Sequence, residues 1–164
     1  MVLAVCLAGL PAAAAPASVP AERTARVVHV TDGDTVWIDM MDSGLRPEGR
    51  IKLRIDGIDA PESCQTGGPQ AQTALAQRVL GQIVTVQLSR QDAFARWLGR
   101  LHHEGEDVGA WMVSQGWAWN YRFASGQGPY AAEERQARQA QRGLFADTDP
   151  MPPRVFRQWH GPCR

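Results

Sequence analysis

The order in which strand and helix patterns follow one another constrains this chain more than any other feature. Apolar residues alternate with polar ones, which is the period of a β-strand, in five short segments. These segments are 26–30, 36–40, 51–55, 84–88 and 97–101. A helical pattern over 69–80 separates the third segment from the fourth. Because no strand–helix–strand unit repeats, this order predicts a small, partly open Greek-key barrel rather than a parallel sheet.

Two more helices are expected after the fifth strand, which makes three in all. Asp107 is placed to cap a short helix that contains Trp111 and ends at Gly116. An amphipathic pattern over 131–142 predicts the last helix. The chain after it is expected to be irregular, because prolines occur at positions 150, 152 and 153.

The size and composition of the chain indicate one globular domain. Of its 164 residues 44% are hydrophobic and 21% are charged, which is enough for a full core and excludes wholesale disorder. We expect the domain to span 22–146, followed by the irregular tail over 147–164. The 17 basic and 17 acidic residues cancel, so any contact with a polyanion must be local.

The first 21 residues predict a signal peptide and a short linker. Residues 2–10 are almost entirely apolar, and 12–15 supply the small residues after which a signal peptidase cleaves. The stretch is shorter than the roughly 20 apolar residues that a membrane span needs, and no later run approaches that length. We therefore expect an exported protein, periplasmic or secreted, with no membrane association.

Two cysteines, Cys64 and Cys163, remain once that segment is removed. An even pair in an oxidising compartment favours a disulfide. Zinc binding is less favoured, because neither cysteine has a second cysteine or a histidine at ligand spacing. On the chain-entropy model, a disulfide that closes a loop of this size contributes about 4 to 5 kcal/mol.

Two acidic clusters carry the clearest functional pattern. They are Asp32-Gly33-Asp34-Thr35 and Asp59-Ala60-Pro61-Glu62, with Arg54 between them and Arg96 after them. The first cluster alone is best interpreted as a hairpin turn, because Asp-Gly is a common turn dipeptide. Hard divalent cations take carboxylate and carbonyl oxygens, and a guanidinium pairs two donors with two phosphate oxygens. Together, carboxylates and arginines indicate metal-assisted attack on a phosphate.

These residues, in this order, resemble the staphylococcal nuclease family. The resemblance runs from about Arg26 to Phe145 and includes Gly99-Arg100 and the Gly143-Leu144-Phe145 segment. It implies a five-stranded OB-fold Greek-key barrel with three α-helices. It also implies a calcium-dependent phosphodiesterase that cleaves single-stranded DNA and RNA and leaves 3′-phosphates.

The resemblance assigns a calcium site. By position, Asp34 and Asp59 would be the carboxylate ligands, and the backbone carbonyl of Ala60 would be a further oxygen ligand, with waters completing the shell. Asp32 would remain a turn residue. The family often has threonine in place of Ala60, but a ligand supplied through the backbone does not need that side chain.

The resemblance also assigns catalytic roles. Glu62 would position and deprotonate the attacking water. Arg54 and Arg96 would bind the non-bridging phosphate oxygens and stabilise the charge that builds in the transition state. Phe94 stands where a tyrosine is frequent in the family, so one hydroxyl contact to the nucleotide is expected to be lost.

Alternating aromatic residues follow the short helix. They are Trp117, Trp119, Tyr121 and Phe123. Such a run can be a base-stacking platform, but alternating aromatics more often fill a core face, and we favour the core for the tryptophans. By position, Tyr121 and Phe123 fall near the aromatic rings that the family places beside the nucleotide.

A second hypothesis is a catalytically silent OB module that binds nucleic acid or protein. Membership of a family does not guarantee activity, and the net charge of zero gives no general attraction to nucleic acid. A silent member would be expected to lose acidic or arginine positions, and this chain retains them. The enzyme is therefore favoured, as a monomer without a stable protein partner.

Overall fold

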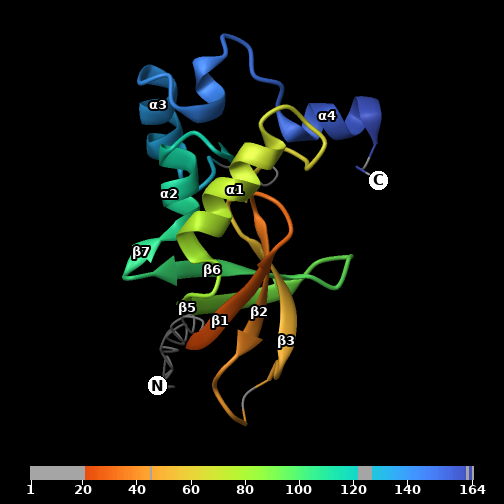
Figure 1. Cartoon of the computed structure of the whole chain (residues 1–164), viewed down its shortest axis with the longest axis vertical. Helices are drawn as coiled ribbons and strands as arrows, with labels where there is room; N and C mark the ends of the chain where they lie inside the picture. The colour runs from red at the N-terminus through yellow and green to blue at the C-terminus, as the bar shows by residue number, and fades with distance from the viewer. Residues whose placement is uncertain (1–20, 45, 122–126, 162, 164) are drawn as a thin grey trace, which may run out of the picture.

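The computed structural model describes most of the chain and is drawn in Figure 1. The described residues are 21–44, 46–121, 127–161 and 163. The expected signal peptide and linker span residues 1–21, of which 1–20 lie outside the described residues, as does Phe123. Among the described helices, none has the length and apolar character needed to cross a membrane.

A barrel closed by five strands forms the centre of the described structure. The strands are β1 (Glu22–Val30), β2 (Thr35–Met40), β3 (Arg50–Ile55), β5 (Ile83–Gln91) and β6 (Trp97–His103). Antiparallel pairing runs in the order β3-β2-β1-β5-β6, and a parallel pairing of β3 with β6 closes the barrel. The predicted five-stranded barrel of the OB type is confirmed.

Three short strands extend this framework: β4 (Ile58–Asp59), β7 (Glu106–Asp107) and β8 (Trp119–Asn120). β4 pairs with β8, and β7 continues the sheet beyond β6. Alternation buries one face of the barrel strands, where Val27, Leu53 and Ile55 are fully buried. Burial of this apolar face is the main source of stability for such a domain.

Helix α1 (Gly68–Val79) covers the barrel end that carries the acidic clusters. Its residues Leu75 and Val79 are fully buried, as expected for one apolar helix face. Gly33, in the turn before β2, approaches the helix so closely that an added Cβ would lie 2.8 Å from Ala71 and 2.7 Å from Ala60. A glycine is therefore needed here, and it seats the turn that carries Asp34 against α1.

The other two predicted helices are also present. In α2 (Val108–Ser114), Asp107 is the N-cap and accepts a hydrogen bond from the Ala110 N–H at 3.1 Å. α3 (Ala131–Gln139) packs beside α2, away from the acidic clusters (Figure 1). A short 3₁₀ turn, Gly143–Ala146, follows it.

The predictions of three helices and of an irregular tail are wrong in one respect. A fourth helix, α4 (Pro153–His160), is present in the described part of the tail. Proline breaks a helix in its interior, but at the first helical position its fixed φ suits the helix and its missing N–H costs nothing. Pro153 occupies such a position, and Val155 N–H donates to the carbonyl of Pro152 at 2.9 Å.

The predicted disulfide is present and fastens this tail to the domain. Cys64, in the loop between β4 and α1, is bonded to Cys163, three residues after the end of α4, with the two Cα atoms 5.7 Å apart. The side-chain amide of Gln65 also donates to the carbonyl of Met151 at 2.7 Å. α4 is therefore held next to the second acidic cluster (Figure 1).

Candidate active site

The barrel strands bring three of the predicted residues together. Asp34 immediately precedes β2, and β2–β3 pairing sets its neighbour Thr35 opposite Arg54. Arg54 reaches across and donates from Nη2 to Asp34 Oδ2 at 3.1 Å and to Asp59 Oδ1 at 2.9 Å. The two predicted metal-binding carboxylates therefore converge on one guanidinium nitrogen.

Both carboxylates are almost completely enclosed. Asp34 is 6% exposed and Asp59 is 5% exposed. Asp34 Oδ1 accepts the Thr35 hydroxyl at 2.7 Å, and Asp34 Oδ2 also accepts the Ala60 N–H at 3.2 Å. These contacts fix the direction of the carboxylate and tie Ala60 to it, so the three residues of the predicted ligand set lie in one cluster.

Glu62 is bound by an arginine that sequence reasoning did not assign to the site. Arg157, on α4, donates from Nη1 to Glu62 Oε1 at 2.7 Å. It also donates to both oxygens of Asp59, from Nη1 to Oδ1 at 3.2 Å and from Nη2 to Oδ2 at 3.0 Å. The disulfide prediction contained a usable indication, because it placed Cys163, and with it the neighbouring arginines, beside Glu62.

Arg96 lies in the hairpin between β5 and β6 and is directed by Asp92. Its Nε and Nη2 lie 2.9 and 2.8 Å from Asp92 Oδ2. Asp92 Oδ1 accepts the N–H groups of Phe94 and Arg96 at 2.9 and 3.0 Å, so one carboxylate shapes both the turn and the guanidinium. The Arg96 guanidinium also lies 5.4 Å from the centroid of the Phe94 ring.

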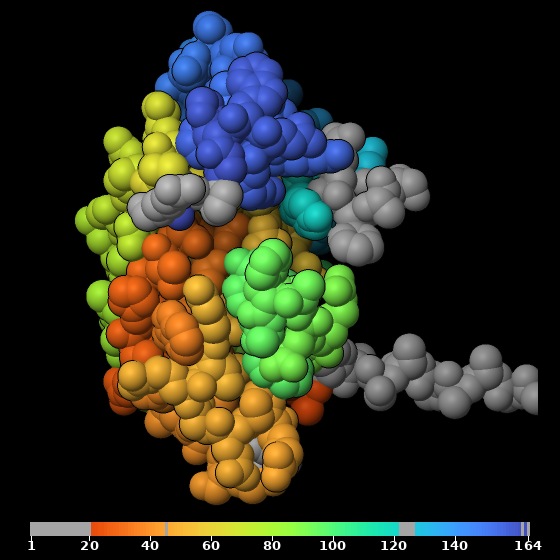
Figure 2. All heavy atoms as spheres, turned by 90° about the vertical axis from the view of Figure 1, so that its right-hand side faces the viewer, coloured from red at the N-terminus to blue at the C-terminus, as the bar shows by residue number. Residues whose placement is uncertain are grey.

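A cleft of about 510 Å³ connects these groups. Asp34, Arg54, Glu62, Arg96, Tyr121 and Arg157 are among the residues that line it. Figure 2 shows this side of the molecule, where α4 (blue), the β5–β6 hairpin (green) and the barrel strands (orange) meet. Tyr121 lies with its ring centroid 5.6 Å from Arg54 Cζ, whereas Phe123 is outside the described residues.

Burial and charge shift several pKa values in the cleft. Burial, with a contribution from the charge of Asp34, raises the pKa of Asp32 to about 7. Burial also raises the pKa of Asp59, although its bonds to Arg157 oppose that shift. Asp32 keeps its predicted turn role, since it accepts the Asp34 N–H at 3.0 Å, but it also lines the cleft.

The donor set fits a hard divalent cation. Among the residues that the structure describes, no three acidic, histidine or cysteine side chains form a metal-binding group. Calcium nevertheless commonly takes two carboxylates, with backbone carbonyls and waters in the remaining positions. Asp34 and Asp59 lie close enough together to bind the same cationic group, the Arg54 guanidinium. Asp34 and Asp59 are therefore suited to hold such a cation.

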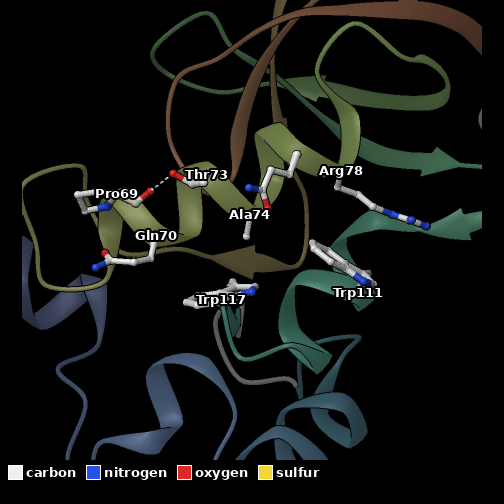
Figure 3. Close-up of a pocket in the computed structure, with 8 residues that line it drawn as sticks. Pro69, Gln70, Thr73, Ala74, Arg78, Trp111 and Trp117 are labelled. Atoms are coloured by element: carbon white, nitrogen blue, oxygen red, sulfur yellow. Dashed lines mark hydrogen bonds between the residues drawn. The ribbon is translucent and has the colours of Figure 1, made fainter.

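A second hollow of about 620 Å³ lies between α1 and α2 and differs in its chemistry (Figure 3). Trp111 and Trp117 line it beside Gln70 and Thr73. The charged side chain in its lining is Arg78, which forms an ion pair with Glu106. The favoured core interpretation holds for Trp119, which is buried, and Trp117 also packs against the core although part of its side chain is exposed at this hollow.

Comparison with known proteins gives matches over most of the domain. The family described as "Staphylococcal nuclease homologue" matches residues 52–147. An "Uncharacterized endonuclease" of Escherichia coli O157:H7 is 37% identical over 133 residues, which cover 80% of this chain and 83% of the relative. A Haemophilus influenzae protein of the same description is 31% identical over 137 residues, covering 84% and 74%. The "Staphylococcal-like nuclease CAN1" of Arabidopsis thaliana is 31% identical over 109 residues, covering 66% and 34%.

Proposed function

Because the chain belongs to the staphylococcal nuclease family and is similar to proteins described as endonucleases, we propose that it cleaves DNA and RNA with the help of calcium. The observation that carries this proposal is the convergence of Asp34, Arg54 and Asp59, with Glu62 in the same cleft. Water attacks phosphorus, and the products carry 3′-phosphates. Single-stranded DNA and RNA are the proposed substrates.

Asp34, Asp59 and the backbone carbonyl of Ala60 are the proposed calcium ligands. The Ala60 N–H donates to Asp34 Oδ2 at 3.2 Å, and this contact supports the assignment because it holds Ala60 beside the carboxylates. When bound, calcium polarises the phosphate oxygens as a Lewis acid. Burial of Asp34 and Asp59 keeps the two carboxylates in place and limits competition from water.

Glu62 is the proposed general base. It orients the water and takes its proton at a carboxylate oxygen, as the role requires a group within hydrogen-bond reach of the water. Glu62 follows Pro61 at the edge of the cleft, and its backbone N–H donates to Gln65 Oε1 at 3.2 Å. This bond fixes the loop from which the carboxylate extends.

Arg54 and Arg96 are the proposed phosphate-binding groups. A guanidinium offers paired donors that match two phosphate oxygens and stays charged throughout the reaction. Arg96 approaches from the β5–β6 hairpin and Arg54 from the end of β3, so a phosphate in the cleft would meet a donor from each side. Tyr121 and Phe123 are proposed, on family position, to contact the nucleotide.

The protein is further proposed to act after export, as a monomer. A disulfide between Cys64 and Cys163 supports this location, because such bonds persist in oxidising compartments. The domain proposed for this activity spans 22–146.

Digestion of single-stranded DNA and RNA by the purified full-length protein tests the proposed function. We expect cleavage with calcium, none with EGTA, and at least about a 100-fold loss of rate in Glu62→Gln, because a general base contributes this much. Glu48→Gln, at an exposed position in the loop before β3, is the matched control and should retain the wild-type rate. The fragments should accept a 5′-label from a polynucleotide kinase without phosphatase treatment, since their 5′ ends are hydroxyls.

Equal cleavage with calcium, with EGTA and by Glu62→Gln would contradict the mechanism. Binding of single-stranded DNA without any cleavage would instead indicate the catalytically silent OB module.

A further inference from the structure

A cation from outside the barrel binds one of the proposed calcium ligands. Arg157 meets Asp59 end-on, with Nη1 on one carboxylate oxygen and Nη2 on the other, and it also binds Glu62. Paired contacts of this kind are among the stronger hydrogen bonds that proteins make. The proposed reaction assigns no role to this arginine, although it engages both a metal ligand and the general base.

Calcium and Arg157 cannot both use Asp59 in this arrangement. Both oxygens of Asp59 already accept hydrogen bonds. Oδ1 accepts from Arg54 and Arg157, and Oδ2 accepts from Arg157. A divalent cation bound to either oxygen would lie within a few ångströms of a guanidinium, and like charges at such distances in a poorly solvated site repel strongly. Binding of calcium therefore requires one guanidinium to leave.

Arg157 is the group that can leave more easily. The Arg54 side chain is 16% exposed, starts from a barrel strand and is bonded to both carboxylates. The Arg157 side chain is 38% exposed and starts from α4, in which Pro153 is the buried residue. A hollow of about 560 Å³ lies against this segment and is lined by Phe156 and His160, so α4 has room to shift.

The disulfide keeps Arg157 close even when it is displaced. Cys163 lies shortly after Arg157, and its partner Cys64 lies two positions after Glu62. A short covalent connection gives a tethered group a high effective concentration at its site. Arg157 is thus an internal cation that rebinds whenever calcium leaves.

Resting on the proposed function, we propose that Arg157 is a positioning residue that holds Asp59 and Glu62 in the metal-free protein and competes with calcium for Asp59. Its guanidinium gives the buried Asp59 a second cationic partner beside Arg54 and gives Glu62 one as well. The competition sets the calcium concentration at which the site fills. The apparent affinity for calcium is reduced in proportion to the fraction of molecules in which Asp59 is free of Arg157.

Calorimetric titration with calcium chloride tests this competition without measuring activity. The full disulfide-bonded chain is titrated as wild type, Arg157→Gln, Arg157→Lys and Arg154→Gln. Arg157→Gln should bind calcium about tenfold more tightly, the change expected if roughly one molecule in ten has a free Asp59 in the wild type. Arg157→Lys keeps the charge but not the fork, and it should fall between the two.

Arg154→Gln is the matched control, because it removes the same charge from an exposed position of the same helix. Its calcium affinity should stay within about twofold of the wild type, since exposed charges are screened. A double Cys64→Ser, Cys163→Ser variant removes the tether while leaving Arg157 in place. It should bind calcium more tightly than the wild type, by about threefold, because the effective concentration of Arg157 falls.

Unchanged or weaker calcium binding in Arg157→Gln, with a normal melting curve in EGTA, would overturn the inference. If Arg154→Gln tightened calcium binding as much as Arg157→Gln, the cause would be the loss of positive charge in general, and the inference about Arg157 would be overturned. Absence of calcium binding in every variant would overturn both this inference and the proposed metal site. Binding that Asp34→Asn abolishes but Arg157→Gln leaves unchanged would overturn the inference alone.

Discussion

The barrel and the C-terminal helix each supply an arginine to the same aspartate, and they hold it in different ways. Arg54 belongs to β3, whose register is fixed by pairing with β2 on one side and β6 on the other. Arg157 belongs to α4, which is attached through a disulfide, one hydrogen bond from Gln65 and its own ion pairs. The site therefore has two halves. The fixed half consists of the residues carried by the barrel and its turns, among them Asp34, Arg54 and Asp59, and the fastened half is α4 with Arg157.

The largest expected difference between the halves is in stability. Arg54→Gln should lower the free energy of unfolding by about 3 kcal/mol in EGTA, because two buried carboxylates lose a shared partner. Arg157→Gln should lower it by about 1.4 kcal/mol, the free energy that corresponds to a tenfold competition with calcium. Urea unfolding of both variants measures the difference, and equal losses would contradict the division of the site into two halves.

Removal of the disulfide tests how firmly the fastened half is bound. The Cys64→Ser, Cys163→Ser variant should lose about 2 to 3 kcal/mol of unfolding free energy, less than the chain-entropy value for so long a loop. The reason is that the reduced protein can release α4 while the barrel stays folded. Hydrogen exchange provides the local readout: α4 amides should lose protection in the variant, and β1 and β2 amides should keep it.

The pH dependence of stability tests the fixed half. Burial raises the pKa of Asp32 to about 7 in the folded state, so the folded protein binds more protons than the unfolded chain between about pH 4 and 7. Stability from this group therefore falls as the pH rises through that window. Asp32→Asn removes the effect and should be about 1 kcal/mol more stable than wild type at pH 8 in EGTA, since the open cleft screens part of the shift.

The gap between Asp32→Asn and wild type should close toward pH 4. Asp149→Asn, at an exposed position, is the control and should show no such gap. A gap that widened in acid would contradict the raised pKa of Asp32.

The smallest expected effect concerns the hairpin that carries Arg96. Phe94 is 79% exposed and its ring lies under the Arg96 guanidinium, whereas Asp92 binds that guanidinium directly. Phe94→Ala should lower kcat/KM for single-stranded DNA by no more than about threefold, since an exposed cation–π contact is weak. A loss above tenfold would show that the position of Arg96 depends on the exposed Phe94 ring rather than on Asp92.

Sequence patterns predicted the fixed half because its determinants are local. Ile51, Leu53 and Ile55 alternate, and that alternation alone defines β3 and the face from which Arg54 extends. The order of Asp34, Arg54 and Asp59 also matches a known family, and the structure brings the three together. For these residues, local pattern and tertiary structure agree.

The fastened half was not predicted, for two physical reasons. Clustered prolines were interpreted as helix breakers, although Pro153 begins a helix. The contact of Arg157 with Asp59 spans most of the chain and lies beyond residue 147, where the family match ends. Neither periodicity nor motif order determines which arginine of a distant helix enters a site. The predicted disulfide was the one link between the second acidic cluster and the C-terminal tail.

The parallel pairing of β3 with β6 has a consequence for folding kinetics. Arg54 lies opposite Leu98, and Arg96 immediately precedes β6, so the two arginines proposed to bind phosphate come to line the same cleft only when this non-local pairing forms. The meander of β1, β2 and β3 joins neighbours in sequence and costs far less chain entropy to assemble. During refolding, recovery of nuclease activity should therefore lag behind recovery of sheet structure. The rate at which activity returns would then report the rate of barrel closure.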